Sequence, residues 1–211
     1  MKIALFGASG NIGKRIGAEA LERGHEVTAM IRHTSRSENK CMHCVSVDIT
    51  DPAKVAAAVK GHEAVINAVS PAGNAAGDNM LVQAAKSLLE ALPRAGIRRL
   101  LIVGGAGSLE VAPGKQLMDS PDFPPAWKGV ALAHRDALQV YLADKTLDWT
   151  YFSPAAFIEP GKRTDKFRTG TDQLVVDGKG ESRISMEDFA VFLLNELESP
   201  KAIRQRLTAA Y

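Results

Sequence analysis

The 211-residue sequence has only two cysteines, and both lie in the segment Cys41-Met42-His43-Cys44. A CxxC pair is typical of a redox centre or of half a structural zinc site. A structural zinc needs more ligands than one such pair supplies, and the sequence holds no second cysteine pair. We therefore expect no metal, and we interpret the two cysteines as reduced residues that lead into a strand at 45–47.

The sequence also lacks a long apolar run and a strong charge of one sign. A membrane-spanning helix needs about 20 apolar residues, and only four apolar residues separate Met1-Lys2 from Gly7. A secretory signal would need a longer apolar segment with a small-residue cleavage site. The net charge of +2 is too small to indicate a nucleic-acid surface. We expect a cytoplasmic monomer or homodimer that binds neither membranes nor nucleic acid.

Short apolar runs alternate along the chain with segments of helical periodicity. Strands are expected at 3–6, 27–31, 45–47, 64–67, 100–103 and 149–152, with shorter ones at 174–176, 183–185 and 207–209. Helices are expected at 11–23 with Asn11 as the cap, and at 51–61, 78–92, 126–145 and 186–197. This order predicts a single α/β domain over 1–211, a doubly wound parallel sheet with a small C-terminal elaboration on the substrate side.

Two segments, 109–125 and 157–172, interrupt the alternation of strands and helices. Both follow the carboxyl end of a strand, which is where ligands bind in parallel sheets, so we expect substrate-side loops. The second contains the basic residues Lys162, Arg163, Lys166 and Arg168. These bind an anionic substrate or form a solvated face, and the sequence leaves both interpretations open.

The glycine-rich segment Gly7-Ala8-Ser9-Gly10-Asn11-Ile12-Gly13 directly follows the first strand and opens the first helix. A helix N-terminus offers free N–H groups and a positive dipole end, and glycine lets the backbone approach a phosphate closely. This context predicts a site for the pyrophosphate of a dinucleotide. The spacing is GxxGxxG, which differs from the commonest dehydrogenase fingerprint.

The end of the second strand reads Met30-Ile31-Arg32-His33-Thr34, with no acid to bind a ribose 2′-hydroxyl. Arg32 is placed to bind a 2′-phosphate, with Ser9 and Arg36 as possible helpers. The alternative for Arg32 is an exposed surface arginine. This pattern favours NADP(H) over NAD(H).

Together with Val47-Asp48, Asn67-Ala68-Val69 and the segments 103–108 and 147–154, these motifs resemble the atypical short-chain dehydrogenase/reductases. The chain is similar to their NAD(P)H-binding family, with its Rossmann fold, which includes nitrogen-repression regulators, biliverdin reductase B and bacterial proteins named NADH-flavin reductases. The resemblance implies that Asp48 binds the adenine, although a turn ahead of Pro52 also explains it. It further implies cofactor contacts from Ala68, Val69, Ser70, Gly104, Pro154 and Ala155.

Orthodox members of this superfamily use a Tyr-x-x-x-Lys pair as general acid. The literal match here, Tyr141 to Lys145, lies too near the strand that ends at Pro154 to reach a ligand. The resemblance implies that Arg135 takes the place of the lysine in the related regulators, and that Ala131 stands where the tyrosine of orthodox members would sit, so the usual acid is missing. We expect Arg135 to hold the nicotinamide ribose, and His134 and Ser108 to contact the substrate. His134 titrates near neutrality in water, and packing is its alternative role.

Hydride transfer to a flavin, quinone or similar flat acceptor needs no protein acid, because solvent can supply the proton. Such a site needs an apolar slot, and its candidate walls, which are equally interpretable as ordinary core, are Met118, Phe123, Trp127 and Phe157. The sequence therefore predicts an NAD(P)H-dependent reductase with flavin as a possible substrate. A non-catalytic NADP(H) redox sensor is the alternative; a sugar-nucleotide epimerase would need the missing tyrosine and a larger substrate domain.

Overall fold

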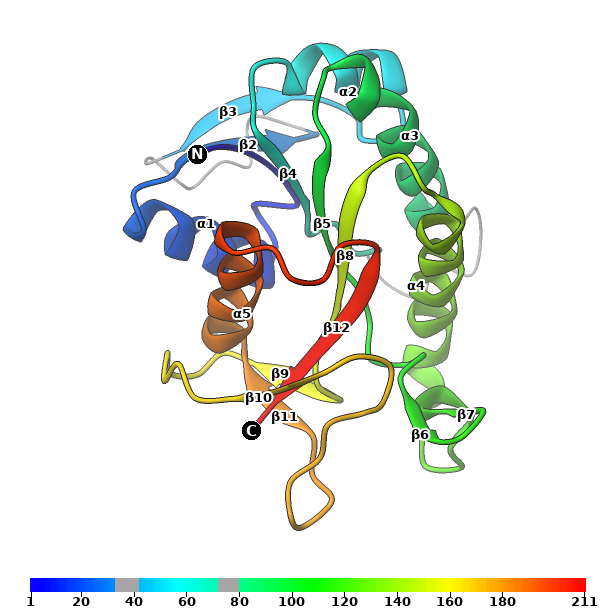
Figure 1. Ribbon diagram of the computed structural model, residues 1–211. Coiled ribbons are helices and arrows are strands. Elements are labelled where there is room, and N and C mark those ends of the chain that lie inside the picture. Colours follow the sequence, from blue (N-terminus) through cyan, green and yellow to red (C-terminus); the bar gives the residue numbers. More distant parts are fainter. Residues whose placement is uncertain (33–41, 72–79) are drawn as a thin grey trace.

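The computed structural model describes residues 1–32, 42–71 and 80–211 (Figure 1). The strands of its large sheet are β1 (Lys2–Phe6), β2 (Glu26–Ile31), β3 (His43–Ser46), β4 (Ala64–Asn67), β5 (Arg99–Val103), β8 (Asp148–Ser153), β10 (Arg168–Gly170) and β12 (Gln205–Ala210). The helices are α1 (Asn11–Glu22), α2 (Pro52–Val59), α3 (Met80–Arg94), α4 (Pro125–Ala143) and α5 (Met186–Glu198).

These strands form one eight-stranded sheet in the order β10-β12-β8-β5-β4-β1-β2-β3. Neighbouring strands are parallel, except that β10 pairs antiparallel with β12 at one edge. The chain moves outward from β1 to β3, returns to β4, and then moves outward on the other side. The strand order therefore reverses between β1 and β4, which is where doubly wound sheets open a ligand crevice. The predicted doubly wound α/β fold is confirmed.

Helices cover both faces of the sheet, with α1 and α5 on one face and α2, α3 and α4 on the other (Figure 1). Successive residues of β1 alternate between two cores: Ile3 and Leu5 pack beneath α1 and α5, whereas Ala4 and Phe6 face the opposite helices. All of these side chains are buried. This two-sided burial explains why the strand reads as a continuous apolar run.

Two sequence expectations about local structure are wrong. Residues Leu174 to Val176 form no strand: strand-type pairing is limited to an isolated bridge between Gln173 and Glu110, in which Leu174 N–H donates to Glu110 O at 2.8 Å. Asn11 does not cap α1: Gly10 is the N-cap, and no side chain accepts a capping bond there. The predicted start of the third helix at 78 lies outside the described residues, and α3 is described from Met80.

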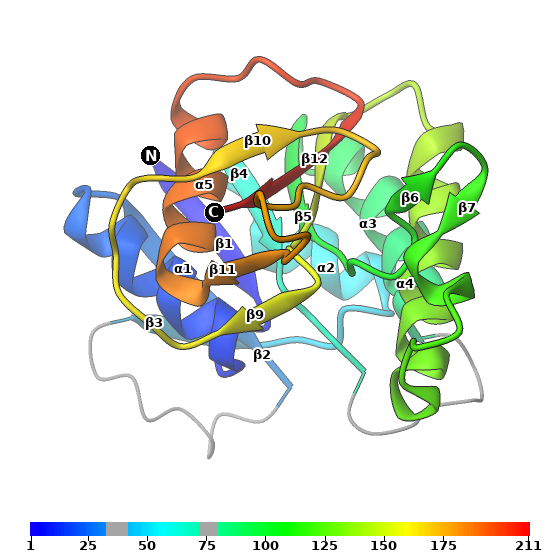
Figure 2. The same cartoon turned by 90° about the horizontal axis from the view of Figure 1, so that it is seen from below.

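Both predicted loop segments contain short regular elements. Residues 109–125 hold the hairpin of β6 (Glu110–Ala112) and β7 (Lys115–Gln116) and a 3-10 helix at Leu117–Asp119. Residues 157–172 hold β10 and also β9 (Phe157–Glu159), which pairs in parallel with β11 (Arg183–Ser185). Seen from below, the hairpin lies beside α4 and the β9–β11 pair lies near α5 (Figure 2).

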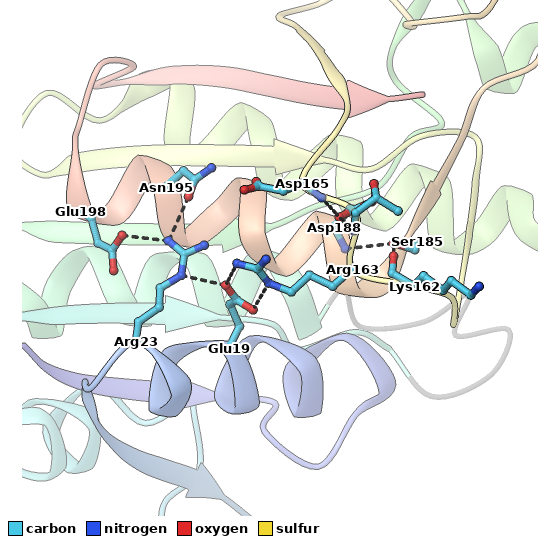
Figure 3. A network of polar contacts seen from close by, with 10 residues as sticks. Glu19, Arg23, Lys162, Arg163, Asp165, Ser185, Asp188, Asn195 and Glu198 are labelled. Atoms are coloured by element: carbon cyan, nitrogen blue, oxygen red, sulfur yellow. Dashed lines mark hydrogen bonds and ion pairs between the residues drawn. The ribbon is translucent and has the colours of Figure 1, made fainter.

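A network of carboxylates, which we call the carboxylate clasp, holds residues 161–165 against α1 and α5 (Figure 3). Glu19 accepts two bonds from Arg163, at 2.9 and 3.0 Å, and one from Arg23 at 2.8 Å. The buried Asp188 carboxylate accepts from the backbone N–H groups of Thr164 and Asp165 and from the Thr164 hydroxyl. Arg163 in the predicted basic cluster is therefore a structural residue.

Arg168, at the other end of that cluster, donates to the backbone carbonyl oxygens of Val176 and Tyr211. It therefore connects β10 to the C-terminal residue rather than presenting a free cation. Within the described part of the chain, no helix has the length and apolar character needed to span a membrane.

Candidate functional site

The glycine turn between β1 and α1 is built so that its backbone packs against itself and against β4. Gly7 has a φ of +77°, and a Cβ there would lie 2.4 Å from the Ala68 carbonyl oxygen. A Cβ on Gly13 would lie 2.0 Å from the carbonyl oxygen of Gly7. The Gly10 N–H closes the turn by donating to Gly7 O at 3.0 Å. Side chains are therefore excluded from both positions by backbone atoms that cannot move aside.

The N-terminus of α1 supplies the polar groups of this turn. The first N–H groups of a helix have no partner within the helix and lie at its positive dipole end. The first turn of α1 carries no acidic side chain, so nothing on that turn neutralises this end. The cradle fits the pyrophosphate of a dinucleotide, whose negative charge such groups bind.

A cavity of about 470 Å³ runs from this turn along the carboxyl ends of the strands. The predicted site residues that line it are Gly7, Ser9, Gly10, Asn11, Ile12, Arg32, Asp48, Ala68, Val69, Ser70, Gly104 and His134. The structure adds residues that were not predicted as site residues: Phe6, Met30, Ile31, Val47, Ile49, Met80, Val103 and Met186. Most of these flank a predicted site residue at a strand end, so strand-end position was the signal that could have found them.

Arg32 and Asp48 are the charged residues of the described cavity lining, and they lie at the same end of it. Asp48 Oδ1 accepts from Thr50 N at 2.9 Å and from Thr50 Oγ1 at 2.8 Å. These two bonds, and more weakly the positive charge of Arg32, lower the pKa of Asp48. Asp48 therefore makes the turn ahead of α2 and lines the cavity as well, so its two interpretations are compatible.

Val103 ends β5 and Gly104 follows it, on the opposite side of β4 and β1 from β2 and β3, and His134 packs against the loop after β5. With Met80 and Met186, these residues make up the part of the lining that we call the apolar end. His134 is 8% exposed, and burial lowers its pKa to about 4. The expected titration of His134 near neutrality is therefore wrong, because the described surroundings supply no charge to favour the imidazolium form. A neutral imidazole still offers one N–H donor and one nitrogen acceptor to a ligand.

Five predicted site residues do not line this cavity: Gly13, Ser108, Arg135, Pro154 and Ala155. Gly13 packs against the Gly7 carbonyl within the turn. Pro154 and Ala155 are buried. The hydroxyl of Ser108 is buried and accepts from Arg206 Nη1 at 3.0 Å. Arg135 is half-buried, and its guanidinium bonds the neighbouring Asp136 at 2.8 Å. Their predicted contacts with cofactor or substrate stay predictions.

The literal Tyr-x-x-x-Lys match lies away from the cavity, as its position in the sequence indicates. Tyr141 is buried beside the rings of Trp149 and Tyr151, while Lys145 is exposed and its Nζ contacts Leu142 O at 3.5 Å. Ala131 packs directly against the loop after β5. A Cβ added to Gly107 would lie 2.5 Å from the Cβ of Ala131.

The predicted aromatic walls are not part of the described cavity lining. Trp127 and Phe157 are 51% and 48% exposed, and the Arg183 guanidinium lies 4.8 Å from the Phe157 ring centroid. Met118 is buried and Phe123 is half-buried. Met80, Met186 and His134, rather than these four residues, supply the side chains at the apolar end of the cavity.

The described residues contain no group of three or more His, Cys, Asp or Glu side chains that could hold a metal ion. Cys41, His33 and Arg36 lie outside the described residues, so neither the CxxC pair nor the help expected from Arg36 is placed. Cys44 lies half-buried on β3, where its thiol contacts Met42 O at 3.6 Å.

Three solved structures share this fold and a large part of the sequence. A "putative exported protein" from Burkholderia pseudomallei is 49% identical, with a TM-score of 0.91 and 100% of both chains covered. A "putative epimerase" from Bacteroides thetaiotaomicron is 38% identical, covering 100% of this chain and 96% of that one, with a TM-score of 0.91. A "putative NADH-flavin reductase" from Streptococcus pneumoniae is 31% identical, covering 100% and 99%, with a TM-score of 0.88.

The model of the family described as NAD(P)H-binding matches residues 7–200, from the first glycine of the turn to the residues that follow α5. The match spans both the phosphate turn and the strand ends that line the cavity. It agrees with the resemblance carried by the glycine motif and by the segments after β3, β4 and β5. The chain belongs to the NAD(P)H-binding family, and its ligand is a nicotinamide dinucleotide.

Proposed function

We propose that this protein is an NADPH-dependent oxidoreductase that passes a hydride to a flavin, quinone or similar flat acceptor. The observation that carries the proposal is the division of one cavity into two chemically different ends. Arg32 and Asp48 supply charge at one end, whereas Met80, Val103 and Met186 make the other end apolar. The "putative NADH-flavin reductase" relative supports a reductase of this class.

The preference for NADP(H) rests on Arg32. It follows β2, lines the cavity and is exposed, so its guanidinium is available to a 2′-phosphate. The strand offers no acid in its place to bind the 2′-hydroxyl of NAD(H). In this proposal the glycine turn binds the pyrophosphate, and Ala68, Val69 and Ser70 border the riboses.

At the apolar end, the described lining contains no ionised side chain at neutral pH. Burying a charged acceptor there would cost several kcal/mol because no opposite charge faces it. A flat, uncharged ring fits better, and the thioethers of Met80 and Met186 pack adaptably against such rings. When bound, the dinucleotide supplies the hydride from its nicotinamide. We propose that His134 orients the acceptor as a neutral hydrogen-bonding group.

The test is NADPH oxidation with riboflavin, FMN and a benzoquinone as acceptors. We expect turnover with riboflavin and the quinone at least as fast as with FMN, because the FMN phosphate gains no charged partner among the described residues of the apolar end. Tight NADPH binding without turnover of any acceptor would contradict the reductase proposal. A preference for FMN that disappears in Lys162→Ala would show instead that this exposed lysine recognises an anionic acceptor.

A second candidate function, a non-catalytic sensor of the NADP(H) redox state, is favoured by the packing of Gly107 on Ala131. By the resemblance, Ala131 stands where orthodox members of the superfamily carry their catalytic tyrosine, and its close packing on Gly107 supports a site without that acid. The same feature argues against the epimerase reaction, even though one relative carries that name. Binding without turnover, together with a partner protein released or captured on switching NADPH for NADP⁺, would support the sensor.

We propose a cytoplasmic location. One relative is named an exported protein, so the location needs a direct test. Subcellular fractionation of a producing cell, with immunodetection of the protein, decides between the two locations.

A further inference from the structure

Arg206 is a buried arginine on β12 that no sequence motif singles out. Its side chain is 8% exposed, and its guanidinium bonds two separate loops. Nη1 donates to the Ser108 carbonyl at 3.1 Å and to the Ser108 hydroxyl at 3.0 Å. Nε donates to Asp172 Oδ1 at 2.9 Å, and Nη2 pairs with the same oxygen at 2.7 Å.

Arg206 lies directly opposite Tyr151 in the register of β12 and β8. The two residues hold the two ends of the loop at residues 104–108. The Tyr151 ring packs beneath Gly104, where an added Cβ would lie 2.0 Å from the ring, while Arg206 holds Ser108. Between these points, Gly105 packs on His134, and a Cβ there would lie 3.2 Å from the imidazole.

The loop at 104–108 therefore leaves the cavity at Gly104 and is held by backbone and side-chain bonds at its far end. Leu109 N–H donates to Ala106 O at 2.9 Å, and Met118 N–H donates to Gly107 O at 2.9 Å. Arg206 connects this structure to the C-terminal strand, more than ninety residues later in the chain.

A buried guanidinium contributes little net free energy to folding, because removing its charge from water is costly. Its carboxylate partner, Asp172, has a side chain that is 65% exposed, so solvent weakens the attraction between them. An apolar residue at such a position is often equally stabilising or more so. What an arginine adds is a planar fork that holds two acceptors in fixed directions.

We infer that Arg206 is a positioning residue that sets the loop at 104–108, and through it the nicotinamide end of the cavity. The inference rests on the proposed function for the meaning of that end. It assigns Arg206 no contact with cofactor or substrate: the residue acts through Ser108, Gly105 and Gly104.

Arg206→Met removes both the planar guanidinium and its charge. Arg206→Lys keeps the charge but lacks the planar group that binds Ser108 and Asp172 at the same time. Arg99→Met is the matched control. Arg99 is buried to the same degree as Arg206, and it bonds Thr150 Oγ1 at 2.8 Å and the Glu196 carboxylate at 3.3 Å. It begins β5, whereas Val103 at the other end of that strand lines the cavity.

The readout is the affinity for NADPH divided by the affinity for 2′,5′-ADP, which lacks the nicotinamide, measured by calorimetry on the folded full chain. We expect Arg206→Met to lower this ratio about fivefold or more, since a misplaced loop weakens only the nicotinamide contacts. Arg206→Lys should fall between this variant and the wild type. Arg99→Met should lower the melting temperature but leave the ratio within about twofold.

Hydrogen exchange adds a second readout, in which the Leu109 and Met118 amides should exchange faster in Arg206→Met than in Arg99→Met. An unchanged affinity ratio in Arg206→Met, or the same fall in Arg99→Met, would overturn the inference. The proposed function fails separately, if the wild type binds NADPH but reduces no acceptor, because the affinity ratio needs no turnover.

Discussion

The hydroxyl of Tyr151 donates a hydrogen bond of 2.9 Å to the carbonyl oxygen of His134. Tyr151 is on β8 and His134 is on α4, so the bond fixes the helix to the sheet beside the cavity. Burial raises the pKa of Tyr151, so its hydroxyl remains a donor. A core tyrosine thus positions the histidine that lines the apolar end of the cavity.

The pH dependence of stability should reveal the buried, neutral His134. Its pKa is about 4 in the folded protein, against 6.5 for an ordinary histidine. The unfolded chain therefore takes up this proton first as the pH falls, and stability is lost between those two values. At about 1.4 kcal/mol per pKa unit, the full loss is between about 3 and 4 kcal/mol.

Urea unfolding of the wild type and His134→Gln over this pH range measures that loss. We expect the difference between the two free energies of unfolding to shift in favour of the variant as the pH falls. The carboxylates are common to both proteins and cancel in the comparison. A difference that stays constant with pH would show that His134 titrates alike in the folded and unfolded states.

Gly7→Ala should abolish tight dinucleotide binding, because its Cβ would meet the backbone of Ala68 as well as adopt a positive φ. Gly24→Ala is the control for backbone strain alone. Gly24 has a φ of +79°, close to that of Gly7, but no atom lies within 4 Å of an added Cβ. Both variants should lose about 1–2 kcal/mol of stability from the positive φ.

Calorimetric titration with NADPH separates the two glycine variants. Gly24→Ala should bind NADPH as the wild type does, whereas Gly7→Ala should show a dissociation constant raised by about a hundredfold or more, since the turn must move away from the phosphates. Similar affinities in both variants would mean that the turn does not hold the pyrophosphate.

Arg32→Ala should reduce the preference for NADPH over NADH. A charge-assisted hydrogen bond contributes about 1.5–3 kcal/mol, which corresponds to roughly a ten- to hundredfold loss of NADPH affinity. NADH affinity should change little, because NADH has no 2′-phosphate. Arg94→Ala, an exposed arginine paired with Glu90 on α3, is the matched control. An unchanged affinity ratio in Arg32→Ala would refute the role given to Arg32.

Glu19→Gln should weaken the carboxylate clasp of Figure 3 without changing any residue that lines the cavity. Glu19 is 6% exposed, and its bond to Arg163 is the largest factor that lowers its pKa. Replacing the carboxylate weakens its charge-assisted bonds to Arg23 and Arg163, which we expect to lower the free energy of unfolding by about 1–3 kcal/mol. Limited proteolysis should then cut faster within 161–166.

The same change at Glu181 is the control for Glu19→Gln. Glu181 pairs with Arg183 at 3.1 Å, but both of these side chains are about half exposed. Such pairs contribute little, about 0–1 kcal/mol. Equal losses of stability at Glu19 and Glu181 would show that the clasp behaves as an ordinary surface ion pair.

The strands and helices that meet at the phosphate turn could be predicted because each carries a local signal. The buried run of β1, the glycines and the start of α1 are adjacent in sequence. The conformation of this strand–turn–helix segment therefore depends on few other residues. The strand expected at 174–176 is wrong for the opposite reason. A short apolar run does not specify its own partner, and here the pairing with Glu110, more than sixty residues earlier, is limited to a single bridge.

The sequence by itself determined the doubly wound fold and the glycine turn where the match to the NAD(P)H-binding family begins. Each of these follows from residue types at short spacing. Only the tertiary structure decided that His134 is neutral and that Ser108 is bound to Arg206. It also decided that the Arg163 guanidinium binds the Glu19 carboxylate rather than a ligand. Burial and long-range hydrogen bonds set those properties, and both depend on residues far apart in the chain being brought together by the sheet.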